Sequence, residues 1–489
     1  MKNKERFPYM QYSICQLPWT YGSVEKFVTN IRIMKKSLSL CRSYCQLLRQ
    51  WARFSSQHRT QAGYIRSFSQ TGTLQQGCCT SQILHHCRIG SYRLYCTRAE
   101  EIAEEDEDLV EVPSLSLHQK RTNILAKFRT EHNDPTNHTI DDEGMFYKVP
   151  HDEYESMYKI NSGQDITNSH ILQVKSFQES VIMVRRPALE AFDFIDNANL
   201  DYPPMKLMFY GKPGSGKTMT MAHVIHRYAK LGWLTIHFPS MIEWLRYRKT
   251  KPREYSMSSY KEGRFDYTDD AMEWLGYFKK QNAYLLQNIK TTKEYVWSQR
   301  EKSLEGTELL DIIDFGISRR KYASDCIGVI FREIKLKASE KQLKVLVAVE
   351  GVNGFWKNTT IKEQKQLVSA LQVSTFQHFL KLFQPDWTNG VCVGTVCADV
   401  EALDTELDRH KTPYTPHSLL KKQGFEFMDP FIPVLVPEYS SKEAHNCIDY
   451  YIERKWIIKP RALTEEGKKE LMMLSNKNPF KLMEISTWW

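Results

Sequence analysis

The chain has 489 residues, with 67 Lys and Arg residues against 58 Asp and Glu residues and a formal net charge of +9. Hydrophobic residues make up 41% of it and aromatic residues 12%, a composition that excludes a wholly disordered chain. Neither an apolar run of about 18 residues nor a short sequence period occurs, which excludes membrane-spanning helices, collagen and repeat arrays. We therefore expect a folded protein with no membrane partner.

The positive charge is concentrated in the first 99 residues, which carry 15 basic residues and only two acidic ones. The rest of the chain carries 52 basic and 56 acidic residues, so any nucleic-acid contact there depends on local patches. Residues 34–54 combine an apolar helical face with basic side chains and lack acidic ones, which is typical of a mitochondrial transit peptide. We expect residues 1–98 to be a transit peptide and basic leader that directs the chain to the mitochondrial matrix. The alternative is a disordered RNA-binding tail.

Residues 99–170 are predicted to form an acidic linker and an extended N-terminal arm. The segment from Glu100 to Glu111 is rich in acidic residues, and the residues after it are polar without a clear apolar period. The apolar pattern becomes dense from about Ile171, where we expect the main domain to begin. Pro187 then indicates the first turn of a helix.

The strongest signal is a full match to the phosphate-binding motif GxxxxGK[ST]. The match comprises Gly211, Lys212, Pro213, Gly214, Ser215, Gly216, Lys217 and Thr218. An apolar strand at 207–210 precedes the motif, an amphipathic helix follows it as far as Gly232, and a second strand is expected at 233–238. Strand, loop, helix and strand within about 30 residues make the βαβ unit that this motif requires.

The motif also predicts how a nucleotide is held. The glycines let the backbone approach the phosphate oxygens closely, and the start of the helix adds the positive end of its dipole. Lys217 is expected to reach the β- and γ-phosphates, and the Thr218 hydroxyl is expected to coordinate Mg²⁺.

A second ligand for Mg²⁺ is expected at Glu350, which directly follows the apolar run 345–349. A continuous apolar run is typical of a parallel strand that is covered on both faces. The alternative is a core strand with an incidental glutamate at its end. Because Glu350 comes 133 residues after Lys217, the chain between them must contain an insertion, and the apolar pattern over 240–340 is mostly helical.

Two further strands are expected at 390–397 and 431–436, the second at a sheet edge because it contains Pro433. At the end of the first, Thr395 or Asp399 is a candidate polar sensor of the nucleotide, although either could equally be a cap or loop residue.

The spacing of Ser440 and Glu443 predicts a capping box that opens a helix, and Thr464 predicts the start of another. We therefore predict an α/β fold, a P-loop NTPase with an AAA+-like parallel sheet flanked by helices over residues 171–439. A C-terminal helical lid is expected over residues 440–489.

Seven of the 11 cysteines fall in the first 99 residues. The rest of the chain has only four, two of them within an apolar strand pattern, which favours reduced core thiols over a disulfide framework. They are Cys326, Cys392, Cys397 and Cys447.

The order of several motifs resembles the death-associated protein three family, the GTP-binding proteins of the mitochondrial small ribosomal subunit. The matching segments cover roughly residues 125–480. They include Met183–Glu190, Tyr210–Thr218, His223–His226, Tyr295–Trp297, Leu346–Gly351, Asp429–Pro433 and Thr464–Leu471. The family pattern has Asp where this chain has Glu350.

This resemblance implies a structural component of the mitochondrial small ribosomal subunit that acts in mitochondrial translation, with a family link to apoptosis. The implied partners are small-subunit ribosomal RNA and mitochondrial ribosomal proteins, and no homo-oligomeric ring is expected. The implied cofactor is GTP or GDP with Mg²⁺, and ATP stays possible. Residues 246–253, extended by Lys261 and Arg264, are the best local candidate for an RNA contact, although a solvated basic loop is equally consistent.

Two other functions stay open, an active AAA+-like ATPase and a signalling GTPase. The GTPase motif NKxD is absent, since the nearest string, Asn476-Lys477-Asn478-Pro479, lacks the Asp. We expect no catalytic residue, because Gly351 occupies the position after Glu350 where fast ATPases carry a glutamate that positions the attacking water. Hydrolysis is therefore expected to be slow.

Overall fold

The computed structural model describes residues 128–159, 166–246, 253–401 and 413–487, and the backbone of β1 (Arg88–Ile89) and β2 (Tyr92–Arg93). Contacts divide the chain into a unit of residues 1–109 and a unit of residues 110–489. In the first unit, β1 and β2 pair antiparallel. The predicted transit peptide and acidic linker otherwise lie outside the described residues. The second unit carries the fold described below.

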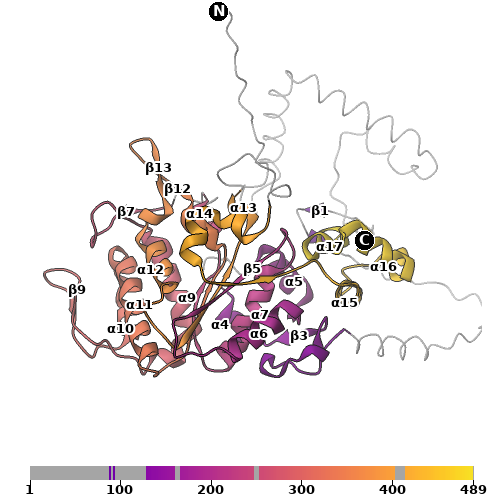
Figure 1. The fold of residues 1–489 in the computed structure, drawn as a ribbon. Coiled ribbons are helices and arrows are strands. Elements are labelled where there is room, and N and C mark those ends of the chain that lie inside the picture. Colours follow the sequence, from indigo (N-terminus) through magenta and orange to yellow (C-terminus); the bar gives the residue numbers. More distant parts are fainter. Residues whose placement is uncertain are drawn as a thin grey trace, which may run out of the picture. The chain divides into compact units, whose positions relative to one another are not determined.

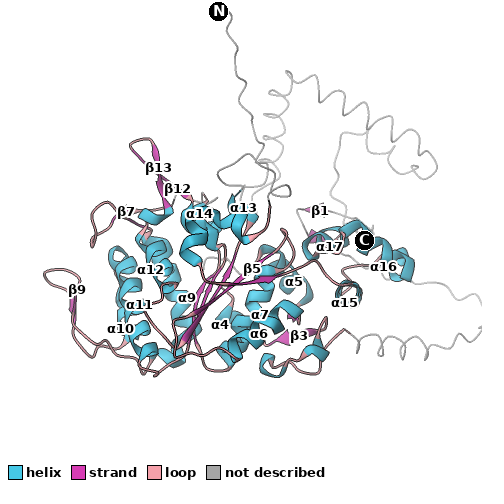
Figure 2. Cartoon of the chain, viewed as in Figure 1, coloured by secondary structure: helices cyan, strands magenta, loops and turns pink. Residues whose placement is uncertain are grey.

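The described part of the second unit is built on a five-stranded sheet in which every pair of neighbours is parallel (Figures 1 and 2). In spatial order the strands are β15 (Ile432–Leu435), β5 (Met205–Tyr210), β14 (Gly390–Thr395), β11 (Val345–Val349) and β6 (Leu234–Phe238). These strands confirm the five apolar runs predicted from the sequence. Pro433 lies on the edge strand β15, as expected.

The two faces of the sheet are covered by different helices, as alternate strand residues point to opposite sides. Leu346 and Ala348 of β11 pack on the face covered by α6 (Arg186–Asp196) and α7 (Lys217–Lys230). The other three residues of β11 pack on the opposite face. The helices that contribute to the core on that face are α8 (Met241–Leu245), α9 (Thr268–Leu286), α10 (Leu309–Ser318), α11 (Ala323–Ser339), α12 (Ser374–Leu382), α13 (Ala398–Glu401) and α14 (Pro416–Met428).

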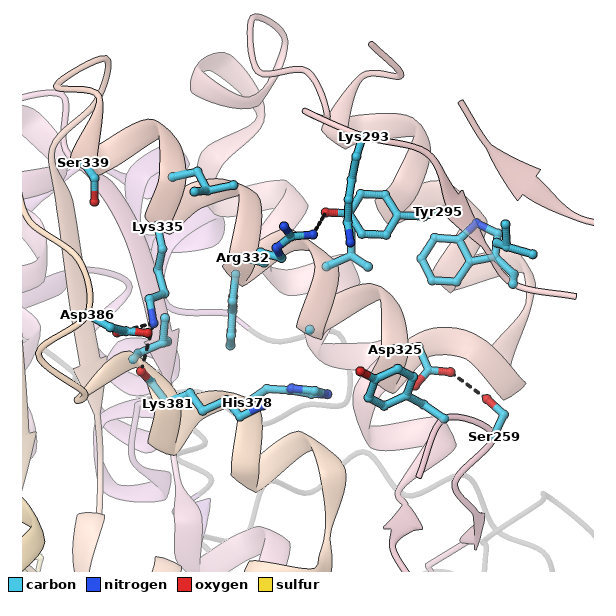
Figure 3. Close-up of a pocket in the computed structure, with 18 residues that line it drawn as sticks. Ser259, Lys293, Tyr295, Asp325, Arg332, Lys335, Ser339, His378, Lys381 and Asp386 are labelled. Carbon is cyan, nitrogen blue, oxygen red and sulfur yellow. Dashed lines mark hydrogen bonds and ion pairs between the residues drawn. The ribbon is translucent and has the colours of Figure 1, made fainter. Parts of the chain in front are cut away.

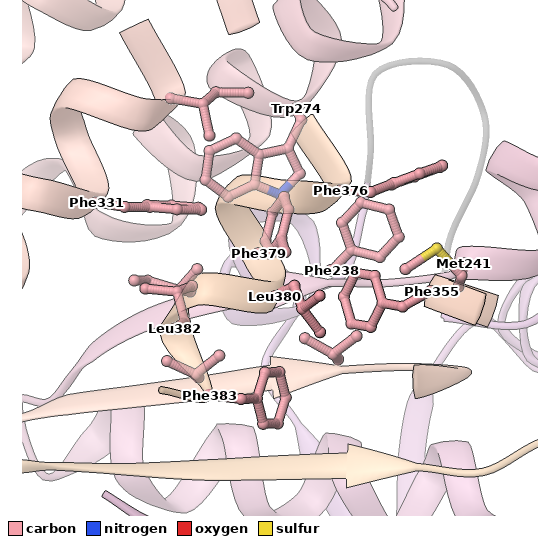
Figure 4. Close-up of a cluster of buried hydrophobic side chains, with 14 of the residues drawn as sticks. Phe238, Met241, Trp274, Phe331, Phe355, Phe376, Phe379, Leu380, Leu382 and Phe383 are labelled. Carbon is pink, nitrogen blue, oxygen red and sulfur yellow. The ribbon is translucent and has the colours of Figure 1, made fainter. Parts of the chain in front are cut away.

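An aromatic cluster anchors this second face (Figure 4). The ring of Phe379 on α12 lies 4.6 Å from that of Phe238 on β6, 5.1 Å from Trp274 on α9 and 5.0 Å from Phe331 on α11, centroid to centroid. Edge-to-face contacts of this kind add about 0.5–1.5 kcal/mol each beyond the area they bury. The cluster therefore ties the helical insertion to the sheet.

The insertion between β6 and β11 contains α9, α10 and α11, which confirms the helices predicted there. It also contains two short hairpins, β7 (Ser256–Met257) with β8 (Phe265–Asp266) and β9 (Tyr295–Val296) with β10 (Lys302–Ser303). A third hairpin, β12 (Asn358–Glu363) with β13 (Gln366–Ser369), follows β11. None of the helices among the described residues is both long and apolar enough to cross a bilayer.

The arm was expected to be extended, but its described part is structured. It contains β3 (Phe146–Val149), which pairs antiparallel with β4 (Ser180–Met183), and the helix α4 (His151–Met157), and α5 (Asn168–Phe177) begins at its end. Tyr147 and Tyr158 are fully buried, and Tyr158 donates a hydrogen bond to the Ala222 carbonyl of α7. Buried tyrosine rings therefore form the apolar contacts of this segment, although most of its other residues are polar.

Three helices follow β15, namely α15 (Ser441–Glu453), α16 (Glu465–Ser475) and α17 (Pro479–Ser486). The capping box of Ser440 and Glu443 and the cap at Thr464 are confirmed. In Figure 1 these yellow helices lie beside α5, and they share an apolar cluster with β3 and β4. The four cysteines of the described residues are free, as predicted.

Candidate functional site

The glycine-rich motif forms the loop between β5 and α7, so the predicted strand, loop and helix are all present. Gly214 and Gly216 have φ angles of +77° and +97°, which side-chain-bearing residues rarely adopt. A Cβ atom on Gly214 would also lie 2.7 Å from Oδ1 of Asn478, so the loop closes against the C-terminal helices.

Lys217 fixes the inside of this loop. Its buried ammonium donates hydrogen bonds to the carbonyls of Gly211 and Lys212, each at 2.9 Å, and it forms no ion pair with any described carboxylate. Burial lowers the pKa of Lys217, and nearby acidic groups oppose that change. The lysine therefore holds a positive charge that lacks a counter-ion inside the loop.

Distant residues hold the outside of the loop. Nδ2 of Asn478 donates to the Pro213 carbonyl at 3.0 Å, and the backbone N–H of Phe480 donates to the Gly214 carbonyl at 3.2 Å. A guanidinium N–H of Arg185 donates to the Ser215 carbonyl at 2.7 Å. Lys217 bonds the carbonyls of Gly211 and Lys212, and the first turn of α7 bonds the carbonyl of Gly216. Every carbonyl from 211 to 216 therefore accepts a hydrogen bond.

The N–H side of the loop is different. The N–H groups of Gly214 and Gly216 make no hydrogen bond within the described part of the chain, and α7 begins without a side-chain cap. The first N–H groups of a helix have no intrahelical partner. The hydroxyl of Ser215 is buried and also lacks a partner among the described residues. This set of unmet donors around a buried lysine fits an anionic phosphate group.

Arg185 connects the loop to the C-terminal helices through a buried ion pair. Its Nε lies 2.9 Å from Oε1 of Glu443, and both side chains are only 5% exposed. The same guanidinium donates to the Pro437 carbonyl at 3.0 Å and lies over the ring of Tyr439. One side chain thus joins the loop, the segment after β15 and the start of α15.

The two predicted metal ligands lie together. The Thr218 hydroxyl donates a hydrogen bond to a carboxylate oxygen of Glu350, at the carboxyl end of β11. Burial raises the pKa of Glu350 to about 7, although Thr218 and Lys217 oppose that change. Mg²⁺ usually takes one or two protein oxygens and completes its shell with phosphate and water. Thr218 and Glu350 fit that role, with Glu350 in place of the family's Asp.

Beyond Glu350 the chain offers no second carboxylate from the same strand end. Gly351 has a φ of +79°, and its N–H donates to the Thr395 hydroxyl at 3.0 Å. The amide of Asn353 is engaged at both ends, because it donates to the Cys397 carbonyl and accepts from the Cys397 N–H, both at 3.0 Å. Thr395 and Asn353 therefore join the ends of β11 and β14.

A cavity of about 580 Å³ opens beside these groups, and its lining includes Lys217, Thr218, Glu350 and Asp399. Its other wall comes from α5, β4 and the C-terminal helices and includes His170. Burial lowers the pKa of His170 to about 4. The cavity thus has the loop at one end and an aromatic and polar wall opposite.

The basic segment predicted for RNA lies only partly in the described residues, since 247–252 fall outside them. Arg253 is buried in an ion pair with Asp270 and donates to the Glu243 carbonyl at 2.6 Å, so it does not offer its charge to a partner. Lys261 and Arg264 instead lie near Lys381 of α12. The sequence pattern identifies the basic side chains, but it does not show which of them form ion pairs within the fold.

The parallel sheet, the glycine-rich loop after β5 and the helix α7 define an α/β protein with a P-loop-type strand–loop–helix unit. Residues 182–485 match the family described as mitochondrial ribosomal death-associated protein 3. The chain belongs to this family, which confirms the resemblance seen in the sequence motifs.

Two curated relatives share the name small ribosomal subunit protein mS29. The Bos taurus protein is 37% identical over 361 residues, which cover 74% of this chain and 87% of the relative. The Mus musculus protein is 35% identical over 358 residues, covering 73% of this chain and 88% of the relative.

Likeness to solved structures is weak. A Walker-type ATPase of Pyrococcus abyssi has a TM-score of 0.32 at 12% identity, covering 62% of this chain and 65% of that one. The ADP complex of Hsp104 from S. cerevisiae has a TM-score of 0.27 at 13% identity, covering 61% of this chain and 43% of that one.

Proposed function

We propose that the chain is a structural, nucleotide-binding component of the mitochondrial small ribosomal subunit. Membership of the mitochondrial ribosomal family and the names of the curated relatives support the ribosomal part. The observation that carries the nucleotide part is the loop itself. Every carbonyl from 211 to 216 is hydrogen-bonded, whereas N–H donors stay unpaired and the buried ammonium of Lys217 forms no ion pair among the described residues. The implied partners are mitochondrial ribosomal RNA and ribosomal proteins, in the matrix.

The fold proposed for this function is an AAA+-like P-loop module. In the sheet, β14 stands between the P-loop strand β5 and β11, which carries the acidic metal ligand at its end. Ligands of open parallel sheets bind at the carboxyl ends of the strands, where the strand order reverses. Loop 211–218, Glu350 and Thr395 all lie at such ends. GTP or GDP is the proposed nucleotide on the family resemblance, with Mg²⁺ held by Thr218 and Glu350.

Sedimentation tests the ribosomal proposal. The full-length chain, tagged at its C-terminus and expressed in cells, is expected to enter mitochondria and to sediment with the small ribosomal subunit in a sucrose gradient. N-terminal sequencing of the recovered protein is expected to show cleavage of the leader within residues 1–98. Protein that stays at the top of the gradient in intact mitochondrial lysate would contradict the ribosomal assignment.

Slow hydrolysis belongs to the same proposal. Gly351 supplies no side chain at the position of a catalytic base, and Asn353 is committed to Cys397. Loss of a general base typically costs about 10²- to 10⁴-fold in rate. Single-turnover hydrolysis of GTP and ATP by the purified chain should therefore be slower than about 1 s⁻¹, the low end of ordinary enzyme rates. A faster rate would favour the active ATPase instead.

A further inference from the structure

A second cavity, of about 600 Å³, lies in the helical insertion and shares no lining residue with the cavity at the P-loop. Helices α11 and α12 form its walls, together with residues next to the β7–β8 hairpin and in the β9–β10 hairpin (Figure 3). Basic and aromatic side chains from these separate elements meet around it. Lys293, Arg332 and Lys381 are exposed, so their charges lie at the open side of this cavity, where a ligand could reach them.

The basic side chains around this cavity are largely unpaired. Of Lys293, Arg332, Lys335 and Lys381, which all line the cavity, Lys335 alone forms an ion pair within the described residues, with Asp386 at 2.5 Å. Burial lowers the pKa of Lys381, and repulsion from Arg264, Lys261 and Lys335 lowers it further. The part of the chain after the leader has more acidic than basic residues, so this cluster is a local concentration of positive charge.

Aromatic rings border the same space. Tyr260 is 83% exposed, and no hydrogen bond of its hydroxyl occurs among the described residues. The rings of Tyr295 and Trp297 lie nearly parallel, at 25° and with centroids 6.2 Å apart. Arg332 donates to the Tyr295 hydroxyl at 3.3 Å, and the ammonium of Lys293 lies 5.1 Å from the centre of the Tyr295 ring. Flat aromatic faces are thus placed next to cations.

A buried polar atom without a partner completes the site. His378 extends from α12 into the cavity (Figure 3), and its Nε2 is buried with no hydrogen-bond partner in the described part of the chain. The ring lies against Gly328 of α11, where a Cβ atom would come within 2.6 Å of it. Burial lowers the pKa of His378 to about 3, so the imidazole is neutral at neutral pH. Across from it, Asp325 accepts a hydrogen bond from Ser259 at 2.7 Å.

We propose that this cavity binds an unstacked nucleotide of single-stranded RNA. The base would stack on the exposed ring of Tyr260, the phosphate would face Lys381 and Arg332, and His378 would bond the edge of the base. Single strands are held by stacking on aromatic side chains within a positively charged groove. The bases of a duplex are paired and stacked inside it, so they are not free to stack on Tyr260, and a polyglutamate peptide carries no aromatic ring or base to stack there. The inference deepens the proposed ribosomal function and rests on it.

Fluorescence anisotropy of the full-length chain with a labelled single-stranded RNA of about 12 nucleotides tests the proposal. Tyr260→Ala should weaken binding about fivefold to a hundredfold, the loss of one stacked base, whereas Tyr260→Phe should bind like the wild type. Lys381→Ala should weaken binding and lower the slope of log affinity against log salt by about 0.7. Lys469→Ala, which removes an exposed lysine of α16, is the matched control and should change neither.

Three results would overturn the inference. The first is unchanged affinity in both Tyr260→Ala and Lys381→Ala, with folding verified by circular dichroism. The second is equal competition by a duplex of the same sequence, and the third is equal competition by a polyglutamate peptide together with no effect of Tyr260→Ala.

Sedimentation separates this inference from the proposed function. If the chain sediments with the small subunit but both variants bind RNA with unchanged affinity, the proposed function stands and the proposed RNA site is rejected. If the chain binds RNA through these residues but does not sediment with the subunit, the proposed function is rejected and the proposed RNA site stands.

Discussion

Lys217 is held by two carbonyl oxygens of its own loop and forms no close ion pair with a described carboxylate. We expect Lys217→Ala to weaken GTP, GDP, ATP and ADP binding by about 10- to 100-fold, since a hydrogen bond to a charged group is worth about 1.5–3 kcal/mol. Isothermal titration measures this directly. Lys469→Ala, which removes an exposed lysine of α16, is the control. Equal affinities in the two variants would contradict the role of Lys217.

Arg185 and its neighbour Arg186 provide a second comparison at the scale of single residues. Arg185→Ala leaves the Glu443 carboxylate buried without its partner, which we expect to cost about 3–5 kcal/mol. Arg186→Ala breaks only an exposed pair with Glu190, worth about 0–1 kcal/mol. Urea unfolding of both variants measures the difference. Similar unfolding free energies would show that the buried pair does not hold the loop to α15.

The start of α17 is the element that reaches the P-loop, and Asn478 performs two tasks there. Its Oδ1 caps α17 by accepting from the Lys481 N–H, while its Nδ2 bonds the Pro213 carbonyl. Asn478→Asp keeps the cap acceptor but loses the N–H and adds a negative charge beside the loop. We expect its unfolding free energy to stay within about 1 kcal/mol of the wild type.

In the Asn478→Asp variant, nucleotide affinity should change more than the unfolding free energy does. It should fall several-fold in Asn478→Asp, and Asn478→Ala should lose both affinity and stability. Nucleotide titration and thermal unfolding, run on the same preparations, separate the two effects. An Asp variant with full affinity would mean that α17 does not shape the phosphate site.

The elements of the sheet were predictable because their signals are local. Apolar runs and the motif between 211 and 218 identify strands, loop and helix without knowledge of the fold. The supports of the loop were not predictable, because Arg185 and Asn478 lie 30 and 265 residues from the carbonyls they bind. The only local hint was a pair of arginines, Arg185 and Arg186, after an apolar stretch, and nothing in the sequence shows which of the two is buried. The arm was predicted to be extended because its apolar residues follow no clear period, and the tyrosines that its described part buries, Tyr147 and Tyr158, pack through contacts with α7 that are distant in sequence.

At the scale of the whole molecule, buried histidines predict sensitivity to acid. Burial lowers the pKa of His170 to about 4 and that of His237 to about 3. The unfolded chain then binds more protons than the folded chain below about pH 6.5, so stability is lost as the pH falls through that value. Each such group contributes a slope of about 1.4 kcal/mol per pH unit until its folded pKa is reached.

His237→Asn should therefore flatten the dependence of the unfolding free energy on pH between about 6 and 4, by roughly that slope. His237 bonds the Tyr277 hydroxyl at 2.6 Å, so some stability at neutral pH should also be lost. Urea unfolding at a series of pH values separates the change in slope from the change in level. An unaltered slope would show that His237 takes up its proton without unfolding.

The contacts of α17 with the P-loop also bear on the order in which the chain matures. A polypeptide is synthesised, and threaded through any pore, from its N-terminus, so the loop emerges more than two hundred residues before Asn478 and Phe480. Until those residues arrive, the Pro213 and Gly214 carbonyls lack these two donors. If the loop binds a nucleotide as proposed, a nascent chain or one truncated before α17 should bind it more weakly than the complete chain.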